Sequence, residues 1–123
     1  MVCLVNDDPA QLEVLARFLR EDGWRVHEYT AAADALKDLK RKPPPDVVVT
    51  DLHMPGIDGL SFCRLLRSGE YPRLDSVPIL VVSATFEGAN IREMCMAAGA
   101  GAFCEIPCSS DEFRRTVETL VGG

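Results

Sequence analysis

The chain has 123 residues, of which 26% are charged and 47% are hydrophobic, and its formal net charge is −6. This length suits one ordinary domain, and the composition is normal for a soluble globular protein. The acidic balance argues against nucleic-acid binding through this domain, because a nucleic-acid surface needs a basic patch to neutralise phosphates. No apolar run reaches the roughly 20 residues of a membrane helix, so we expect no membrane contact.

Five cysteines occur, and their spacing matches neither a disulfide framework nor a zinc site. Cys3, Cys63, Cys95 and Cys104 lie in apolar patterns and are expected to pack as small hydrophobic side chains. Free thiols favour a reducing compartment, so we expect a cytoplasmic protein.

The chain begins with a strand and an amphipathic helix. Residues 2–5 are apolar and predict a short buried strand. Asp8 and Pro9 then predict the N-cap and the first turn of a helix. This helix ends at Gly23, and its apolar face is formed by Leu12, Leu15, Ala16 and Leu19.

The same alternation continues to the middle of the chain. Residues 24–29 predict a second strand and residues 31–40 a second helix. Residues 47–49 are consecutive valines, which is typical of a strand covered on both faces. This strand runs into Asp51, and residues 54–59 form a turn-rich loop.

Two and a half further repeats complete the pattern. A helix is predicted over residues 60–67, with Arg67 on its solvated face, and a strand over residues 79–82. Residues 102–106 predict a fifth strand, and a last helix begins at residues 109–110. A fourth helix is predicted before the fifth strand, and its apolar residues at helical spacing are Ile91, Met94, Cys95 and Ala98. Five strand–helix repeats favour an α/β fold, a doubly wound parallel sheet of five strands with helices on both faces.

Polar residues collect at the ends of the predicted strands, where open parallel sheets bind ligands. They are Asn6, Asp7, Asp8, Asp51, Ser83 and Thr85. Two carboxylates 4 Å apart repel by about 4 kcal/mol at an effective dielectric constant of 20, and a divalent cation removes this penalty. Mg²⁺ commonly binds one or two carboxylates together with waters and phosphate oxygens. The cluster therefore predicts magnesium and phosphoryl chemistry, while the spacing alone leaves open a plain helix cap at Asp8 and a plain turn residue at Asp51.

Residues 47–59 resemble the phosphorylation-site segment of the receiver domains of response regulators in two-component signalling. The resemblance consists of an aspartate after an apolar strand, followed by Met-Pro-Gly-x-Asp-Gly. Residues 5–9 resemble the acidic pocket of that family, residues 78–84 its switch strand, and residues 99–107 the segment leading to its Lys-Pro pair. The resemblance implies a flavodoxin-like (βα)5 fold with three α/β/α layers over residues 1–123, a single domain that we expect to be excised from a longer protein.

The resemblance also assigns roles to the acidic residues. Asp51 would accept a phosphoryl group from the phosphohistidine of a histidine kinase or phosphotransfer protein, a nucleophilic role open to aspartate. Asp7, Asp51 and the backbone carbonyl of His53 would bind Mg²⁺, with Asp8 or Asn6 as further candidate ligands. Asn6 stands where the family often has an acid, so the pocket lacks one negative charge.

The switch residues depart from the family pattern at one position. Ser83 matches the switch hydroxyl that binds the phosphoryl oxygen, and Phe103 matches the aromatic whose rotamer follows the switch. The lysine before Pro107 is Ile106 here. A charged hydrogen bond contributes roughly 1.5–3 kcal/mol, and isoleucine has no donor to make one. The Ile106–Pro107 bond is a candidate cis peptide, because proline lowers the cost of the cis form.

These residues support three hypotheses. The first is a phosphoacceptor in a phosphorelay, with at most self-phosphorylation and self-dephosphorylation activity, which signals to an output domain or partner through the fourth helix, fifth strand and fifth helix. The same face is a candidate homodimer surface by analogy. The second is a pseudo-receiver, a protein-interaction module not switched by phosphorylation, which Ile106 and Asn6 favour. The third is a phosphatase with an aspartate nucleophile and His53 as general acid. The sequence shows no cap domain to hold a substrate, which argues against this third hypothesis.

Overall fold

Five short strands form one parallel sheet in the order β2-β1-β3-β4-β5. This is the doubly wound, flavodoxin-like arrangement predicted from the sequence. The structure is a computed structural model that describes residues 1–71, 73–84 and 90–122. The strands are β1 (Val2–Val5), β2 (Val26–Tyr29), β3 (Val47–Asp51), β4 (Ile79–Ser83) and β5 (Ala102–Glu105).

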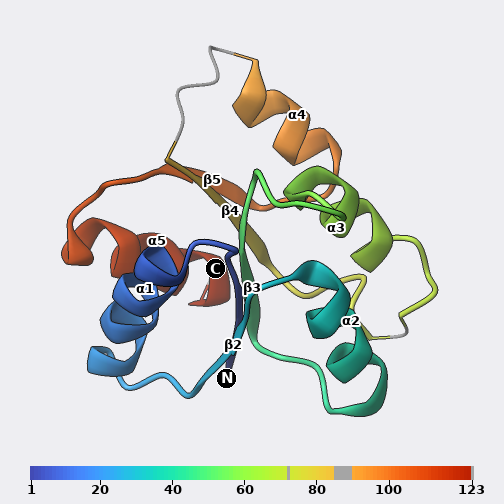
Figure 1. Ribbon diagram of the computed structural model, residues 1–123, viewed down its shortest axis with the longest axis horizontal. Helices are drawn as coiled ribbons and strands as arrows, with labels where there is room; N and C mark the ends of the chain where they lie inside the picture. Colours follow the sequence, from blue (N-terminus) through green and yellow to red (C-terminus); the bar gives the residue numbers. More distant parts are fainter. Residues whose placement is uncertain (72, 85–89, 123) are drawn as a thin grey trace.

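Helices cover both faces of the sheet and complete three layers (Figure 1). One face carries α1 (Pro9–Glu21) and α5 (Ser110–Gly122). The other face carries α2 (Ala32–Arg41), α3 (Gly59–Leu66) and α4 (Ile91–Ala97). Within the part of the chain that the structure describes, no helix has the length and apolar character to cross a membrane.

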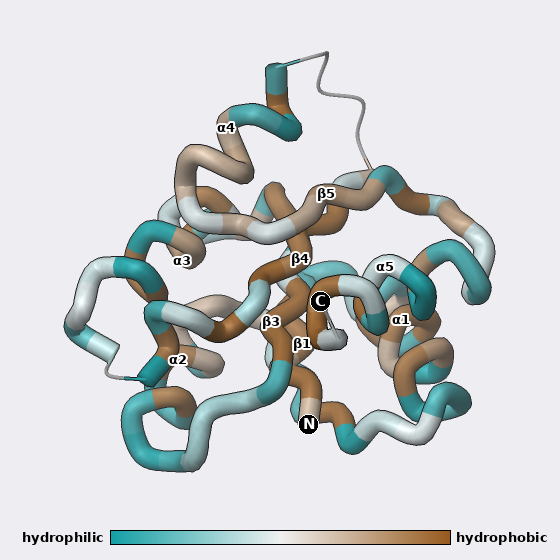
Figure 2. Tube along the Cα trace, turned by 180° about the vertical axis from the view of Figure 1, so that it is seen from behind, coloured by the Kyte–Doolittle hydropathy of each residue, from teal (hydrophilic) through white to brown (hydrophobic). Residues whose placement is uncertain are grey.

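The central strands supply the core on both sides of the sheet. β1, β3 and β4 are buried along their whole length, and Figure 2 shows β3 and β4 as hydrophobic segments between the helices. Because side chains alternate along a strand, Val48 and Val81 pack toward α2, α3 and α4, whereas Val49 and Val82 pack toward α1 and α5. Continuous apolar runs are therefore required here, since neither face of these strands reaches water.

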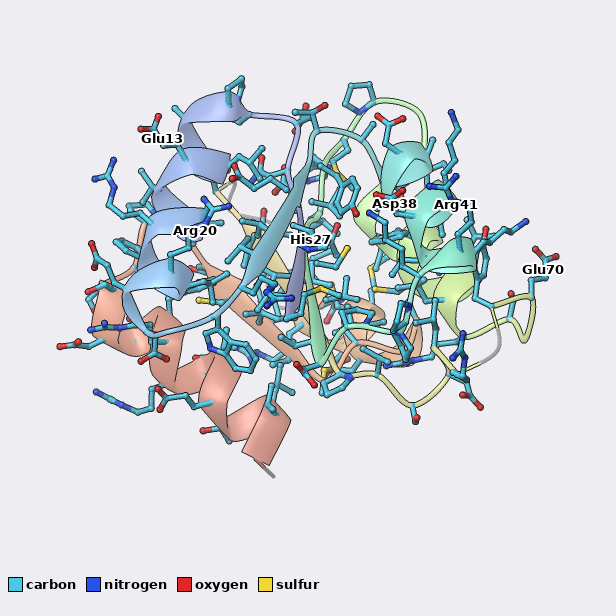
Figure 3. The ribbon with its side chains drawn as sticks, turned by 90° about the horizontal axis from the view of Figure 1, so that it is seen from below. Glu13, Arg20, His27, Asp38, Arg41 and Glu70 are labelled. Atoms are coloured by element: carbon cyan, nitrogen blue, oxygen red, sulfur yellow. The ribbon has the colours of Figure 1, made fainter. Side chains whose placement is uncertain are left out.

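Polar side chains fasten the first two helices to the edge strand β2. Arg20 of α1 pairs with the carboxylate of Glu28 at 2.8 Å and donates to the carbonyl of Val26 at 3.2 Å. On the opposite face, the hydroxyl of Tyr29 donates to Asp38 of α2 at 2.6 Å. Arg20 and Asp38 lie on opposite sides of the sheet in Figure 3. These contacts hold the two helices that flank β1, whose carboxyl end carries the acidic residues.

Arg67 differs from its predicted place on a solvated helix face. Its guanidinium group donates to the carbonyl of Gly99 at 2.9 Å and to the carbonyls of Leu74 and Asp75 at 2.8 and 2.9 Å. The prediction was wrong because Arg67 follows the last residue of α3, where its side chain can reach two connections instead of water. Arg67 thereby joins the connection before β4 to the one before β5.

Two methionine side chains of α4, on opposite flanks of the buried Cys95, are largely in solvent, with Met94 48% and Met96 46% exposed. The helical spacing predicts Met94 on the buried face, and this prediction was wrong. Within its bounds the short α4 buries only Cys95, so its contact with the sheet is a narrow stripe that does not extend to Met94.

Candidate functional site

The pairing of β1 with β3 brings two acidic segments to the same edge of the sheet. Val5 is the register partner of Thr50, so the residues that follow Val5 lie beside Asp51, the last residue of β3. Asp51 is held there by the fully buried strand and is 9% exposed itself. The local cause is the apolar run before Asp51, which fixes the strand between two layers and leaves the carboxylate at its end.

The side chains of Asp7 and Asp51 converge at this edge. Burial, followed by the charge of Asp7 and a side-chain hydrogen bond with Asp7, raises the pKa of Asp51 to about 6. The backbone N–H of Leu52 and the side chain of His53 act in the opposite direction on this pKa. The structure thus brings together two carboxylates that are far apart in the chain, at a cost in like-charge repulsion.

This pair of carboxylates fits a hard divalent cation. Magnesium takes oxygen ligands, commonly one or two carboxylates with several waters, and does not need a cage built only from protein atoms. Among the described residues no group of three or more His, Cys, Asp or Glu side chains could hold a metal ion. The donor set therefore suits Mg²⁺ with a largely hydrated shell and does not suit zinc, which prefers closed sites of nitrogen and sulfur ligands.

Asn6 and Asp8 make local contacts that shape the connection between β1 and α1. The side-chain oxygen of Asn6, which is fully buried, accepts the backbone N–H of Asp8 at 2.9 Å, and its amide donates to Gln11 at 3.1 Å. The carboxylate of Asp8 accepts the backbone N–H groups of Ala10 and Gln11 and caps α1. These bonds fix the backbone on both sides of Asp7 and leave Asp7 free to turn toward Asp51.

Gly59 positions the loop that follows Asp51, a role that we did not predict from the sequence. Its backbone N–H donates to the carbonyl of Leu52 at 2.8 Å, and Asp58 caps α3 by accepting the N–H of Ser61 at 2.8 Å. A Cβ atom on Gly59 would lie 2.4 Å from the carbonyl oxygen of Asp51. Only glycine allows α3 to begin this close to the strand end, and a glycine directly after a helix cap is the signal that could have revealed it.

His53 presents its imidazole to solvent, while its neighbour Leu52 is buried. The side chain lowers the pKa of Asp51 through its charge, so it lies near the carboxylate pair. The predicted metal contact of His53 involves its backbone carbonyl and makes no demand on the ring.

Ser83 ends β4 beside the acidic edge. It is 2% exposed, pairs in register with Glu105, and its carbonyl accepts the backbone N–H of Ile106 at 2.9 Å. The neighbouring strand β3 carries Asp51, so Ser83 lies one strand away from the carboxylate pair. Thr85, the other hydroxyl predicted at this strand end, lies outside the described residues.

Phe103 lies in β5 with its ring in the core on the side of α2, α3 and α4. It is 5% exposed, and the guanidinium group of Arg92 lies over the ring, 5.7 Å from its centroid. Its register partner is Val81, two residues before Ser83 and on the same face of β4. The ring and the Ser83 side chain therefore belong to the same side of the sheet.

Ile106 directly follows β5, at the position where the sequence resemblance led us to expect a lysine. Its side chain is 9% exposed and packs in the core on the side of α1 and α5. With Pro107, to which it is joined by a cis peptide bond, it lines an apolar cavity of about 280 Å³ beside Val14 and Phe18 of α1. This side chain contributes packing at the rim of the site and no hydrogen-bond donor to it.

Comparison with known proteins supports this architecture. The family model of the response regulator receiver domain matches residues 2–118. The receiver domain of the sensor histidine kinase PA1611 from Pseudomonas aeruginosa PAO1, with a magnesium ion coordinated in its active-site cleft, superposes with a TM-score of 0.86 at 28% identity, covering 99% of this chain and 97% of that one. The receiver domain of the response regulator NarL from Mycobacterium tuberculosis gives a TM-score of 0.81 at 29% identity, covering 99% and 95%.

Curated relatives match along nearly the whole chain but are longer. The response regulator MprA of Mycobacterium sp. strain KMS is 35% identical over 120 residues, which is 98% of this chain and 50% of that protein. A protein-glutamate methylesterase/protein-glutamine glutaminase of Hahella chejuensis is 34% identical over 125 residues, 98% of this chain and 34% of that protein. The chain thus spans between a third and a half of these relatives.

Proposed function

Since this chain belongs to the response regulator receiver domain family, we propose that it accepts a phosphoryl group on Asp51 from a histidine kinase or a phosphotransfer protein. The observation that carries this proposal is the convergence of Asp7 and Asp51 at the carboxyl edge of the sheet. An aspartate held at a buried strand end, with a second carboxylate beside it, provides a nucleophile and a cation site in the same place. As a phosphoacceptor, the domain is not an enzyme in the ordinary sense.

Asp7, Asp51 and the backbone carbonyl of His53 would hold Mg²⁺. When bound, the ion neutralises charge on the transferring phosphoryl group and on the carboxylates. Asp51 then offers its carboxylate oxygen to the phosphorus atom, and the connection fixed by Asn6 and Asp8 keeps Asp7 in place beside it. We assign Asn6 and Asp8 these positioning roles because their side chains already bond to the backbone of the β1–α1 connection.

The residues that would respond to phosphorylation would form fewer polar contacts with the phosphoryl group than the residues that would receive it. Ser83 is the hydroxyl we assign to the phosphoryl oxygen, with Phe103 as the ring that follows it. Ile106 supplies no cation, so the charged hydrogen bond of roughly 1.5–3 kcal/mol that a lysine would add is missing. We infer that phosphorylation moves the fold less than it does when a lysine is present, and in the limit the domain acts as a pseudo-receiver, a module that binds partners without being switched.

For the signalling partner we propose the face formed by α4, β5 and α5, which also serves as the candidate surface for a homodimer. The exposed side chain of Met96 supports this choice, because a flexible thioether suits a binding surface. All five cysteines are free thiols, which supports a cytoplasmic location.

The test uses a small phosphodonor such as acetyl phosphate with Mg²⁺ and intact-mass measurement. We expect the mass gain of one phosphoryl group in the native chain and in Asp34→Asn, which changes an exposed acid on α2. No gain is expected in Asp51→Asn or in the presence of a chelator. A native chain that stays unmodified while binding no Mg²⁺ would instead support the pseudo-receiver, and a gain retained in Asp51→Asn would refute the assignment of Asp51.

A further inference from the structure

Two thiols flank the Ile106–Pro107 pair and touch each other. Cys104 lies in β5 and Cys108 in the connection that leads to α5. The thiol of Cys104 donates to the sulfur of Cys108 across 3.7 Å. Cys104 is 7% exposed, whereas Cys108 is only partly buried and lines the apolar cavity beside α1. One sulfur of the pair is therefore open to small solutes, and its partner lies directly behind it.

The other three cysteines lack this combination of contact and access. Cys3 is 2% exposed, and Cys63 and Cys95 are completely buried in the core. Cys95 raises the pKa of Cys63 through its charge, so these two also lie near each other. Neither of them reaches the surface, however, so an oxidant in solution meets Cys108 first.

We propose that Cys104 and Cys108 form a redox-active dithiol that hydroperoxides convert into an intramolecular disulfide. The sulfurs have to approach from 3.7 Å to about 2.05 Å. Cys108 lies outside both β5 and α5, so rotation of its side chain and a shift of the connection can close the gap while the strand and the helix stay in place. The proposal does not depend on phosphorylation of Asp51.

The chemistry proceeds in two balanced steps. The thiolate of Cys108 attacks the terminal OH oxygen of the hydroperoxide, the O–O bond breaks, and the other oxygen leaves as alkoxide, or as hydroxide from hydrogen peroxide, and takes up a proton, which yields a sulfenic acid on Cys108. The sulfur of Cys104 then attacks the sulfur of Cys108, the S–O bond breaks, and the proton of Cys104 leaves with the hydroxide as water. Two thiols and one hydroperoxide thus give one disulfide, one water and the alcohol or water derived from the peroxide.

The order of the two sulfurs follows from their surroundings. Burial raises the pKa of Cys108, but the hydrogen bond from Cys104 lowers it in part. Burial raises the pKa of Cys104 to about 12, and its contact with Cys108 raises it too. Cys108 is therefore the first nucleophile and Cys104 the resolving thiol. Because both values lie above that of an ordinary thiol, we expect oxidation to be slow at pH 7 and faster at pH 9.

The disulfide would act on the part of the site that lacks the family's lysine. It would enclose Glu105, Ile106 and Pro107 in one ring, and both Ile106 and Cys108 line the cavity beside α1. Oxidation would therefore change the wall of this cavity and fix the connection before α5. A partner that contacts this region would distinguish the reduced chain from the oxidised one.

The decisive experiment treats the folded chain with hydrogen peroxide, blocks the remaining thiols with N-ethylmaleimide and maps peptides without reduction. We expect Cys104 and Cys108 to escape alkylation together, as one peptide lighter by two hydrogens, and dithiothreitol to restore both. Cys3, Cys63 and Cys95 should remain alkylated after denaturation. A disulfide between any other pair, or alkylation of all five thiols after excess peroxide, would overturn the proposal.

Single variants test the order of attack. In Cys104→Ser a sulfenic acid should accumulate on Cys108 and be trapped by dimedone, because the resolving thiol is gone. Cys108→Ser should trap little dimedone, and Cys95→Ala should still form the disulfide. Dimedone on Cys104 in Cys108→Ser, at the rate seen for Cys104→Ser, would contradict the assignment of Cys108 as the first nucleophile. The peptide map of the native chain decides the main proposal even if a variant fails to fold.

Discussion

The two halves of the carboxyl edge of the sheet differ in chemistry. At the ends of β1 and β3, Asp7 and Asp51 form a compact anionic pair supported by hydrogen bonds of the neighbouring backbone. At the ends of β4 and β5, Ser83 is the polar group we assign to the site, and Ile106 points into an apolar cavity. Under the proposed function, capture of a phosphoryl group and the response to it would be carried by different strands, and one of the two could weaken while the other persists.

The asymmetry follows from the contribution of each residue to the stability of the fold. Repulsion between two neighbouring carboxylates destabilises the folded chain unless a bound cation neutralises them, so such pairs are typical of functional sites. Ile106, by contrast, stabilises the fold by packing against α1 and α5 and needs no ligand. The anionic half thus carries charges that packing alone does not explain, whereas Ile106 in the apolar half contributes to the core.

The largest expected effect is on Mg²⁺ binding and phosphoryl transfer, and it should distinguish Asp7 from its neighbour Asp8. Asp7→Asn removes one of the two converging charges, so we expect Mg²⁺ affinity and the rate of phosphoryl transfer from acetyl phosphate to fall by on the order of 100-fold. Asp8→Asn is the matched control, because asparagine caps a helix about as well as aspartate. It should lower both quantities by no more than about threefold, the effect of one nearby charge that does not contact the cation. Equal losses in the two variants would mean that general acidity of the connection matters, and not the convergence of Asp7 with Asp51.

The second effect concerns the stability of the metal-free chain. A carboxyl group whose pKa is raised to about 6 binds its proton more tightly in the folded state than in the unfolded state, where the pKa is about 3.9. The folded state is therefore penalised progressively as the pH rises from 4 through 6. In a chelator at pH 7.5, Asp51→Asn should be more stable than the native chain by about 2 kcal/mol, because asparagine carries no charge to repel Asp7.

Urea denaturation of both proteins between pH 4 and pH 7.5 measures this difference. The advantage of Asp51→Asn should vanish near pH 4 and shrink at pH 7.5 when saturating Mg²⁺ stabilises the native chain. An advantage that does not vary with pH would show that it comes from packing and not from charge.

The sequence predicts the fold well because its signals are local and repeated. The apolar runs at residues 2–5 and 47–49 are strands in the structure, and the cap at Asp8 begins α1 as expected. The residues that line the site follow from the rule that parallel strands bring their carboxyl ends together. The sequence is therefore enough to place Asp7 near Asp51, provided that β1 and β3 are neighbours in the sheet, as they are.

The sequence could not predict features that depend on long-range contacts. The hydrogen bonds of Arg67 with Gly99 and Leu74 arise only once two connections meet, and the arginine looks like an ordinary surface residue in its own helix. The contact of Cys104 with Cys108 depends on how the connection after β5 turns. Spacing alone gave no reason to pair these two cysteines.

A third test restores the missing cation. Ile106→Lys should raise about tenfold the equilibrium constant for the conformational change that phosphorylation causes at β5 and α4. The reason is that a charged hydrogen bond to the phosphoryl group becomes available. The aliphatic part of the lysine can retain some of the packing of Ile106. Ile106→Met is the matched control, since methionine has an unbranched chain of similar length to lysine but no charge. Hydrogen exchange before and after phosphorylation measures the change, and identical behaviour of the two variants would show that the missing lysine does not limit the response.

The smallest effect restores the missing charge in the anionic half. Asn6→Asp adds one carboxylate next to Asp7. A unit charge about 6 Å from a divalent ion in water attracts it by about 1.4 kcal/mol, and screening at physiological ionic strength roughly halves this, so the binding constant should rise about threefold. The new carboxylate can still accept the N–H of Asp8, and Gln11 can turn its amide to donate to it, so the connection should keep its shape. Titration with Mg²⁺ measures the gain, and the gain should disappear at high salt, which screens a charge at this distance. An affinity unchanged at low salt would mean that Asp7 and Asp51 already supply all the charge that the cation uses, and that the two halves of the edge differ only at Ile106.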